Sequence, residues 1–255
     1  MLVFEPSTSL FSNLVCFTSS TSLDVGNSVG NFAGLNLGAH VGDKLEHVEA
    51  NRNILRNYLL HQTSNHTAAS FKWLNQQHTT AIYDYKDYTN SGKTNAAPCD
   101  GMVVQQPHVP LVIMTADCMP VVLFCHETST LVCVHAGWRG LVDGILENAL
   151  SRFDNPNQVR VWIGPSISAP FFEVGDDTID QFSSYERSIV SLPNGKHQID
   201  LAEIANLKLS KLGVCKVEVS PICTYDNPQC YSHRRSQHMG LSSTGRLATV
   251  AMITL

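Results

Sequence analysis

The sequence lacks several patterns that would assign it to a common class of protein. No apolar stretch reaches the roughly 18 residues that a membrane-spanning helix needs, and the apolar N-terminus contains Glu5 and Pro6 but no Lys or Arg, unlike a signal peptide. The 17 Lys and Arg residues are scattered, and the net charge of −5 excludes the basic surface that duplex nucleic acid requires. We therefore expect a cytoplasmic enzyme or binding protein that contacts neither membrane nor nucleic acid.

Paired-cysteine motifs are also absent. The eight cysteines include no Cys-x-x-Cys, which excludes a zinc ribbon and a thioredoxin-type site. Their spacing is irregular, and Cys118, Cys125 and Cys133 fall in apolar, strand-like runs. Free thiols are therefore expected in place of a secreted disulfide framework.

What is present is the composition of a globular protein. With 255 residues, of which 43% are hydrophobic and 15% charged, the chain can bury a hydrophobic core, and it can form one large domain or two fused halves. A helix is predicted over 44–60, where Asp43 and Glu46 have the spacing of a capping box. Its apolar periodicity predicts a single buried stripe, formed by Val48, Asn51, Leu55 and Leu59.

Short apolar runs and helical stretches alternate irregularly along the rest of the chain. Further helices are expected after Gly140, from Asp176, and after Asp200 as N-cap. The predicted strands cover 71–78, 102–104, 111–114, 121–125, 131–134, 159–163 and 214–222, together with the apolar C-terminal run that starts at 247. This irregular order favours a mixed-sheet α+β or α/β domain over a regular doubly wound sheet.

The segment 115–140 carries the strongest local signal for chemistry. Two apolar runs flank the polar segment 126–130, which predicts a β-hairpin. If the turn is centred near Thr128, Cys118 and His135 lie at the same open end, within roughly 10 Å at the rise of a strand. A thiol and an imidazole brought together there form two of the ligands that zinc prefers.

A competing interpretation treats Cys118 as a buried core residue, since free cysteine behaves as a small hydrophobe. Two features favour the metal site. Cys118 stands between Asp117 and Pro120 at a strand boundary, and His135 precedes Ala-Gly, which permits a close approach. The pair still needs a third ligand from elsewhere in the chain.

Several polar residues could receive an anionic substrate. Arg139 is expected near the N-terminal end of a helix, a favourable place for an anion. For each arginine a surface or structural ion pair is an alternative of at least equal weight to a ligand contact, and for Asn36 and His40 turn formation is an equal alternative. The residues that we expect to bind substrate or phosphate are Asn36, His40, Arg139 and Arg246, with Arg234 and Arg235 as further donors.

The ordered motifs of the whole chain resemble those of the YfiH family, also called laccase-domain or multicopper polyphenol oxidase proteins. The resemblance covers nearly all of the sequence. The motifs are Leu35-Asn36-Leu37-Gly38, His40-Val41-Gly42-Asp43, Leu74-Asn75-Gln76-Gln77-His78, Thr115-Ala116-Asp117-Cys118-Met119-Pro120-Val121, His135-Ala136-Gly137-Trp138-Arg139-Gly140, Ile163-Gly164-Pro165, Phe172-Glu173-Val174-Gly175, Cys223-Thr224, Ser232-His233-Arg234-Arg235 and Gly245-Arg246.

The resemblance implies a zinc centre, a fold and an activity. Carried over by motif, the zinc ligands and catalytic centre are His78, Cys118 and His135. The implied fold is α+β, with two mixed β-sheets packed face to face and helices outside, a four-layer αββα sandwich in one domain over 1–255. The implied activities are phosphorolysis of adenosine, inosine, guanosine and methylthioadenosine, and deamination of adenosine. Purine nucleosides and phosphate are the expected partners; no oligomeric state is indicated.

The chain also departs from the family pattern. Ser22 stands where the family usually has an arginine, which puts phosphate binding in question, and His78 is followed by Thr79 instead of glycine. An open zinc position suits hydrolytic deamination, which also needs a carboxylate to move protons. Asp117, Asp100 and Glu173 are the candidates, with a purely structural role as the alternative for Asp117.

Three other functions compete with the zinc nucleoside enzyme. Copper ranks below zinc, because a multicopper oxidase (laccase) uses many His-x-His pairs and the 11 histidines here include none. Cys118 could be the nucleophile of a Cys–His hydrolase with His135 as its base, which metal content would distinguish. A non-catalytic nucleoside-binding protein is the remaining alternative.

Overall fold

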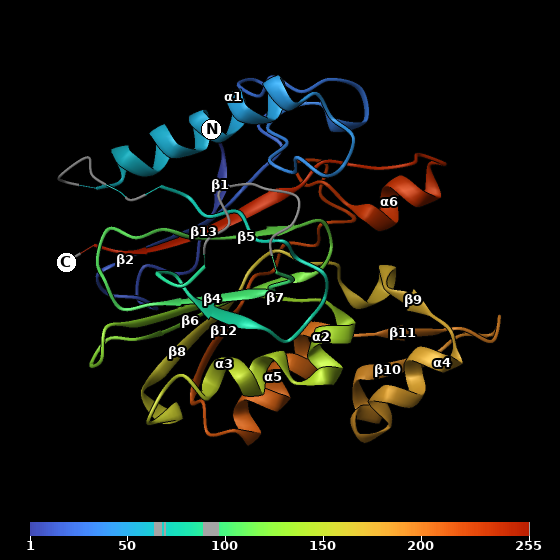
Figure 1. Ribbon diagram of the computed structural model, residues 1–255. Helices are drawn as coiled ribbons and strands as arrows, with labels where there is room; N and C mark the ends of the chain where they lie inside the picture. The colour runs from blue at the N-terminus through green and yellow to red at the C-terminus, as the bar shows by residue number, and fades with distance from the viewer. Residues whose placement is uncertain (64–67, 69, 89–96, 255) are drawn as a thin grey trace.

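Two β-sheets packed face to face form the centre of the molecule (Figure 1), as seen in a computed structural model that describes residues 1–63, 68, 70–88 and 97–254. Buried residues of both sheets meet in one apolar cluster, which includes Leu111 and Ile113 from one sheet and Phe124, Leu131 and Trp162 from the other. Alternate residues of a strand point to opposite faces, so each sheet also presents a second apolar face to the helices outside.

The first sheet has four strands, all paired antiparallel, in the order β1-β2-β13-β5. These are β1 (Val3–Phe4), β2 (Leu14–Ser19), β13 (Leu247–Ile253) and β5 (Leu111–Thr115). Helix α1 (Leu45–His61) packs on the outer face through Leu55 and Leu59, which share an apolar cluster with Phe17 and Val250. Figure 1 shows α1 along one side of the molecule.

The second sheet has six strands in the order β12-β8-β6-β7-β4-β3 and is mixed. Its parallel pairs are β12 with β8 and β3 with β4, at its two edges, whereas the central pairs are antiparallel. Its strands are β3 (Ile82–Asp84), β4 (Gly101–Val104), β6 (Met119–Cys125), β7 (Thr130–Ala136), β8 (Val159–Ile163) and β12 (Lys216–Val219).

The outer face of this second sheet is covered by three helices, which Figure 1 places on the opposite side of the molecule from α1. These are α2 (Trp138–Asp143), α3 (Ile145–Leu150) and α5 (Leu201–Lys211). A third, small antiparallel sheet lies to one side and contains β9 (Glu173–Val174), β11 (His197–Ile199) and β10 (Ile189–Ser191).

Short helices complete the described part of the chain. Two α-helices, α4 (Asp176–Ile179) and α6 (His233–His238), are each less than two turns long. The 3₁₀ segments are η1 (Gly30–Phe32), η2 (Pro156–Gln158), η3 (Ala169–Phe171) and η4 (Asp180–Ser188). None of the helices in the described ranges is long and apolar enough to cross a membrane.

The predicted α+β class is confirmed, together with several of its elements. Helix α1 buries the expected stripe of Val48, Asn51, Leu55 and Leu59. The hairpin forms as β6 and β7, and Asp200 caps α5 by accepting a hydrogen bond from the backbone N–H of Glu203. All eight cysteines are free thiols, as expected.

Other predicted elements were wrong. Residues 71–78 form no strand, because the Gln76 side-chain amide takes the place of a strand backbone by bonding both the N–H and C=O of Met114. Asp43 does not cap α1, since its carboxylate is engaged by Ser28 and Asn36 and Lys44 is the N-cap. The helix expected after Gly140 is split into α2 and α3 at Gly144, whose φ is +98°.

Candidate metal centre and its cationic pocket

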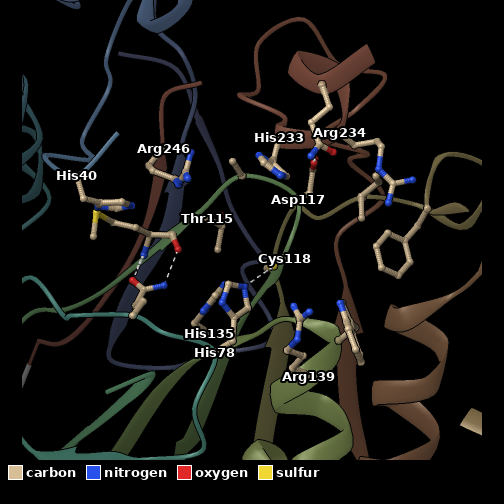
Figure 2. A pocket seen from close by; sticks show the side chains of 17 residues that line it. His40, His78, Thr115, Asp117, Cys118, His135, Arg139, His233, Arg234 and Arg246 are labelled. Carbon is tan, nitrogen blue, oxygen red and sulfur yellow. Dashed lines mark hydrogen bonds between the residues drawn. The ribbon is translucent and has the colours of Figure 1, made fainter. Parts of the chain in front are cut away.

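The hairpin brings Cys118 and His135 together, and an irregular segment brings His78 to them. His135 lies in β7 opposite Pro120, while Cys118 immediately precedes β6. One ligand atom from each of the three side chains lies within 4.8 Å of the others. Figure 2 shows the three side chains converging on the floor of a pocket.

Asp100 fixes the orientation of the His135 ring. Its carboxylate Oδ1 lies 2.8 Å from Nδ1 of His135, and its backbone carbonyl accepts the His135 N–H at 2.7 Å. Both side chains are buried. Because Nδ1 is engaged, Nε2 is the ring atom left to face the other two ligands. A histidine that binds a metal through one ring nitrogen usually donates the N–H of the other to a carboxylate, as His135 does here.

His78 sits at a sharp bend in the chain. Its φ is +59°, in the left-handed region that residues with a side chain seldom occupy. Its Nε2 lies 3.8 Å from Sγ of Cys118. Gly137 permits this approach, since a Cβ there would stand 2.7 Å from Cδ2 of His78 and 3.1 Å from Sγ of Cys118.

The three ligand residues also perturb one another electrostatically. Burial alone would raise the pKa of the Cys118 thiol, but the charge of His135 and hydrogen bonds with both imidazoles outweigh it and lower the pKa to about 6. Burial likewise opposes the positive charge on His135, yet the Cys118 thiolate and the Asp100 carboxylate raise its pKa. Without a metal, a thiolate is thus already favoured at neutral pH.

The donor set fits a divalent zinc ion. Two imidazoles and one thiolate are zinc ligands, and three protein ligands with an open side are typical of catalytic sites. His78 is exposed, Cys118 is half-buried and His135 is buried, so solvent reaches the set at His78. The buried carboxylate of Asp100 completes the shell behind the ligands.

A cavity of about 390 Å³ lies above the ligands. Its apolar and aromatic lining residues include Met114, Trp138, Ile167 and Phe172. The basic side chains around it are the guanidinium groups of Arg139, Arg234 and Arg246 and the imidazoles of His40 and His233. The only carboxylate among the described residues that line it is Asp117. The pocket therefore combines a surface suited to an aromatic base with an excess of positive charge.

The predicted anion-binding residues occupy different places. His40, Arg139 and Arg246 all line the pocket, with His40 beside Arg246 in Figure 2. Desolvation and the charges of Arg246 and Arg52 lower the pKa of His40, which favours its neutral form. Asn36 does not line the pocket but lies buried behind it, where its Oδ1 accepts the backbone N–H of Arg246 at 2.9 Å.

The arginines differ in how far the protein already engages them. Arg139 is exposed at the start of α2, with its guanidinium 4.4 Å from the Trp138 ring centroid. Arg234 donates from Nη1 to the carbonyls of Phe171 and Glu173. Arg235 is used structurally, since its guanidinium donates to four backbone carbonyls of the 224–230 segment.

None of the three expected proton-transfer carboxylates is free inside the pocket. Asp117 accepts from the Thr224 hydroxyl at 2.7 Å and from the Arg234 backbone N–H at 2.7 Å. Asp100 is fully buried behind His135. Glu173 lies in β9, outside the pocket lining, and pairs with Lys196 at 2.7 Å.

Sequence reasoning missed two contributors from α6. His233 and Gln237 line the pocket, although no helix was predicted at 233–238 and neither residue was expected to contact substrate. Ser232 caps the helix by accepting the Arg235 N–H, and this Ser-x-x-Arg start offered only a weak signal. Ser22, at the variant position, does not line the pocket, and its hydroxyl lies 2.9 Å from that of Ser20.

Comparison with known proteins assigns the chain to a family. A family model described as multi-copper polyphenol oxidoreductase laccase matches residues 17–254. The chain belongs to this laccase-domain family. The match confirms the resemblance seen in the sequence, and it includes all three candidate ligands.

The chain aligns with individual members of the family over nearly their full length. The Escherichia coli K12 protein named purine nucleoside phosphorylase YfiH is 34% identical over 241 residues, covering 92% of each chain. A Haemophilus influenzae protein named purine nucleoside phosphorylase is 30% identical over 259 residues, covering 98% of each. The chain therefore spans nearly the whole of these relatives.

Solved structures have the same fold. The Neisseria meningitidis protein NMB0706, assigned to DUF152, superposes with a TM-score of 0.85 at 28% identity and covers 100% of this chain and 99% of its own. YlmD from Geobacillus stearothermophilus gives a TM-score of 0.82 at 27% identity, over 96% and 93%. The laccase-domain architecture is thus shared over the full length.

Proposed function

We propose that the protein is a zinc-dependent purine nucleoside phosphorylase that acts on adenosine, inosine, guanosine and methylthioadenosine. The observation that carries the proposal is the three-ligand centre at the floor of a pocket whose lining includes the rings of Trp138 and Phe172 and three arginines. The relatives named purine nucleoside phosphorylase support the same reaction. The free cysteines are consistent with a reducing compartment such as the cytoplasm.

The pocket residues divide into two chemical roles. The rings of Trp138 and Phe172 offer flat apolar surfaces for a purine base. The guanidinium groups of Arg139 and Arg246, together with His40, can hold the phosphate that attacks the sugar. His78, Cys118 and His135 would hold the zinc ion, which when bound supplies Lewis acidity at the pocket floor.

Holding two substrates in one pocket is the main catalytic contribution of these residues. In phosphorolysis a phosphate oxygen forms a bond to C1′ of the ribose while the bond from C1′ to N9 of the purine breaks. The reaction gives a free base and the sugar 1-phosphate, which is ribose 1-phosphate for adenosine, inosine and guanosine and methylthioribose 1-phosphate for methylthioadenosine. The electron pair of the broken bond leaves on the purine. Fixing phosphate and nucleoside side by side removes much of the entropic cost of their encounter.

Adenosine deamination, the second activity implied by the family resemblance, has less support. Zinc deaminases use a carboxylate as general acid and base. Asp117 is the only carboxylate that lines the pocket within the described ranges, and both of its oxygens are engaged. We therefore rank phosphorolysis first.

A Cys–His hydrolase is the alternative with a specific observation in its favour. Cys118, His135 and Asp100 are arranged as a nucleophile, a base and an orienting carboxylate, and the pKa of Cys118 is lowered to about 6. A thiolate that holds zinc cannot also act as the nucleophile. Metal content therefore separates the two functions, and copper content would separate both from a laccase.

The test combines metal analysis with product analysis. Purified protein is assayed for zinc and copper, and adenosine is incubated with and without phosphate and followed by chromatography. We expect zinc, and adenine that appears only when phosphate is present. Inosine formed without phosphate would indicate deaminase activity, and a zinc-loaded protein that converts no nucleoside would leave a non-catalytic binding protein.

A further inference from the structure

Asp100 contacts both of the segments that carry the candidate histidine ligands. It precedes β4 directly, is 0% exposed, and does not line the pocket. Its two carboxylate oxygens face opposite ways, one toward His135 and the other toward the bend that contains His78. A buried carboxylate is costly unless its oxygens are well paired, and here both are.

The first oxygen determines which ring atom of His135 faces the pocket. Oδ1 accepts the Nδ1 proton of His135 at 2.8 Å. The His135 main chain is also bound, because its N–H donates to the carbonyl of Asp100 at 2.7 Å. Ring and backbone are thus both fixed by one residue, and Nε2 is the ring nitrogen that faces the other ligands and can bind a metal once its proton is displaced.

The second oxygen holds the bend on both sides of His78. Oδ2 accepts the backbone N–H of Gln77 at 3.0 Å, the backbone N–H of Thr79 at 2.6 Å and the Thr79 hydroxyl at 2.9 Å. His78, between them, has the left-handed φ of +59°. Since residues 71–78 belong to no strand, this carboxylate supplies contacts that a sheet would otherwise provide.

We propose that Asp100 is a positioning residue that builds the metal site by orienting His78 and His135 at the same time. The inference rests on the proposed zinc centre and extends it to a residue that touches neither metal nor substrate. A proton-shuttling role would need access to the pocket, which the complete burial of Asp100 excludes. The dual contact also explains why an acidic residue is needed, because only a carboxylate accepts on both edges.

The decisive variant is Asp100→Asn, which keeps the shape but converts one acceptor edge into a donor. If the amide NH₂ faces His135, the Nδ1 proton must move to Nε2, the ligand atom; if it faces the bend, the N–H groups of Gln77 and Thr79 lose their acceptor. Either outcome should weaken zinc binding by about 10- to 100-fold, as losses of such outer-shell partners do. Competition with a chromophoric chelator measures the affinity.

Two further variants test the contacts of Oδ2 with the bend and control for the loss of a buried charge. Thr79→Val removes one donor to Oδ2 and leaves the carboxylate in place, so it should weaken zinc binding less than Asp100→Asn does. Asp43→Asn is the matched control, a buried carboxylate bound to Ser28 and Asn36 and to none of the metal ligands. It should retain wild-type zinc affinity and so report any general effect of losing a buried charge.

A spectroscopic readout distinguishes positioning from simple destabilisation. In zinc-loaded protein labelled with ¹⁵N-histidine, the Nδ1 proton of His135 should exchange slowly in the wild type and in Thr79→Val. It should be absent or rapidly exchanging in Asp100→Asn. Cobalt substitution adds a second signature, because the visible spectrum of bound Co²⁺ should change when the ligand geometry is altered.

Three results would overturn the proposal: Asp100→Asn with wild-type zinc affinity and an unchanged His135 proton, Thr79→Val with unchanged affinity, or a wild-type protein that binds no zinc. The outcomes are independent of turnover. If zinc binding falls as expected but no nucleoside is cleaved by the wild type, the positioning role stands and the proposed reaction fails. If nucleosides are cleaved and Asp100→Asn binds zinc normally, the reverse holds.

Discussion

Arg246 packs directly over Gly38. A methyl group on Gly38 would stand 2.7 Å from Cγ of Arg246, closer than real contacts allow, and 3.2 Å from its Cβ. The backbone N–H of Arg246 and that of Gly38 are both bound by Oδ1 of Asn36. The glycine therefore determines where this arginine enters the pocket.

Gly38→Ala should displace Arg246 and weaken phosphate binding. Loss of a hydrogen bond to a charged group costs about 1.5 kcal/mol or more, so KM for phosphate should rise about tenfold or more. KM for the nucleoside should change much less. Steady-state kinetics with each substrate varied in turn measures the two values. Gly175→Ala is the control, since no atom lies within 4 Å of its added Cβ; equal effects of both variants would contradict the role of Arg246.

Gly137→Ala should disturb the metal centre itself. The added methyl group would press on His78 and Cys118, and misplacing reacting groups by about 1 Å can cost on the order of 100-fold in kcat/KM. Zinc content after dialysis should fall in parallel. Gly140→Ala, in the helix that Gly137 precedes as N-cap, is the matched control because its Cβ would find only ordinary contacts from 3.5 Å outward. A Gly137→Ala protein with full zinc content and activity would argue against the assigned ligands.

Cys118→Ala should remove zinc and activity together. Two histidines remain, and because Lewis-acid stabilisation is worth several kcal/mol, kcat/KM should fall by at least about 100-fold. Atomic absorption and product chromatography on the same preparation test this. Cys215→Ala changes an exposed cysteine outside the pocket and should leave both measurements unaltered. Retained activity in Cys118→Ala would show that the chemistry occurs elsewhere.

In metal-free protein, Cys118 should be the thiol that iodoacetamide alkylates fastest at pH 7. Its pKa is lowered to about 6, so the reactive thiolate predominates above that pH and the alkylation rate should fall as the pH drops through about 6. Burial raises the pKa of Cys230 to about 12, and it should remain unmodified. Peptide mapping by mass spectrometry identifies the labelled site, and added zinc should protect it; uniform labelling of the cysteines would contradict the lowered pKa.

The sequence alone determined those elements that depend on neighbouring residues in the chain. Apolar periodicity determined the buried face of α1, and the polar break at 126–130 between two apolar runs determined the hairpin of β6 and β7. Because antiparallel pairing sets opposite residues by counting from the turn, it also brought Cys118 and His135 to one end. His78 as the third ligand came only from the family resemblance.

Only the tertiary structure decided how the site is supported and what surrounds it. No spacing rule connects Asp100 with both His78 and His135, because those contacts join segments through side chains and not through a backbone ladder. The same holds for 71–78, where the Gln76 side chain replaced the expected strand pairing, and for α6, which brings His233 into the pocket. Local sequence patterns encode the buried faces of helices and strands and the positions of turns. Long-range hydrogen bonds depend on how the sheets and loops pack, and these bonds convert two neighbouring ligands into a defined metal-binding pocket.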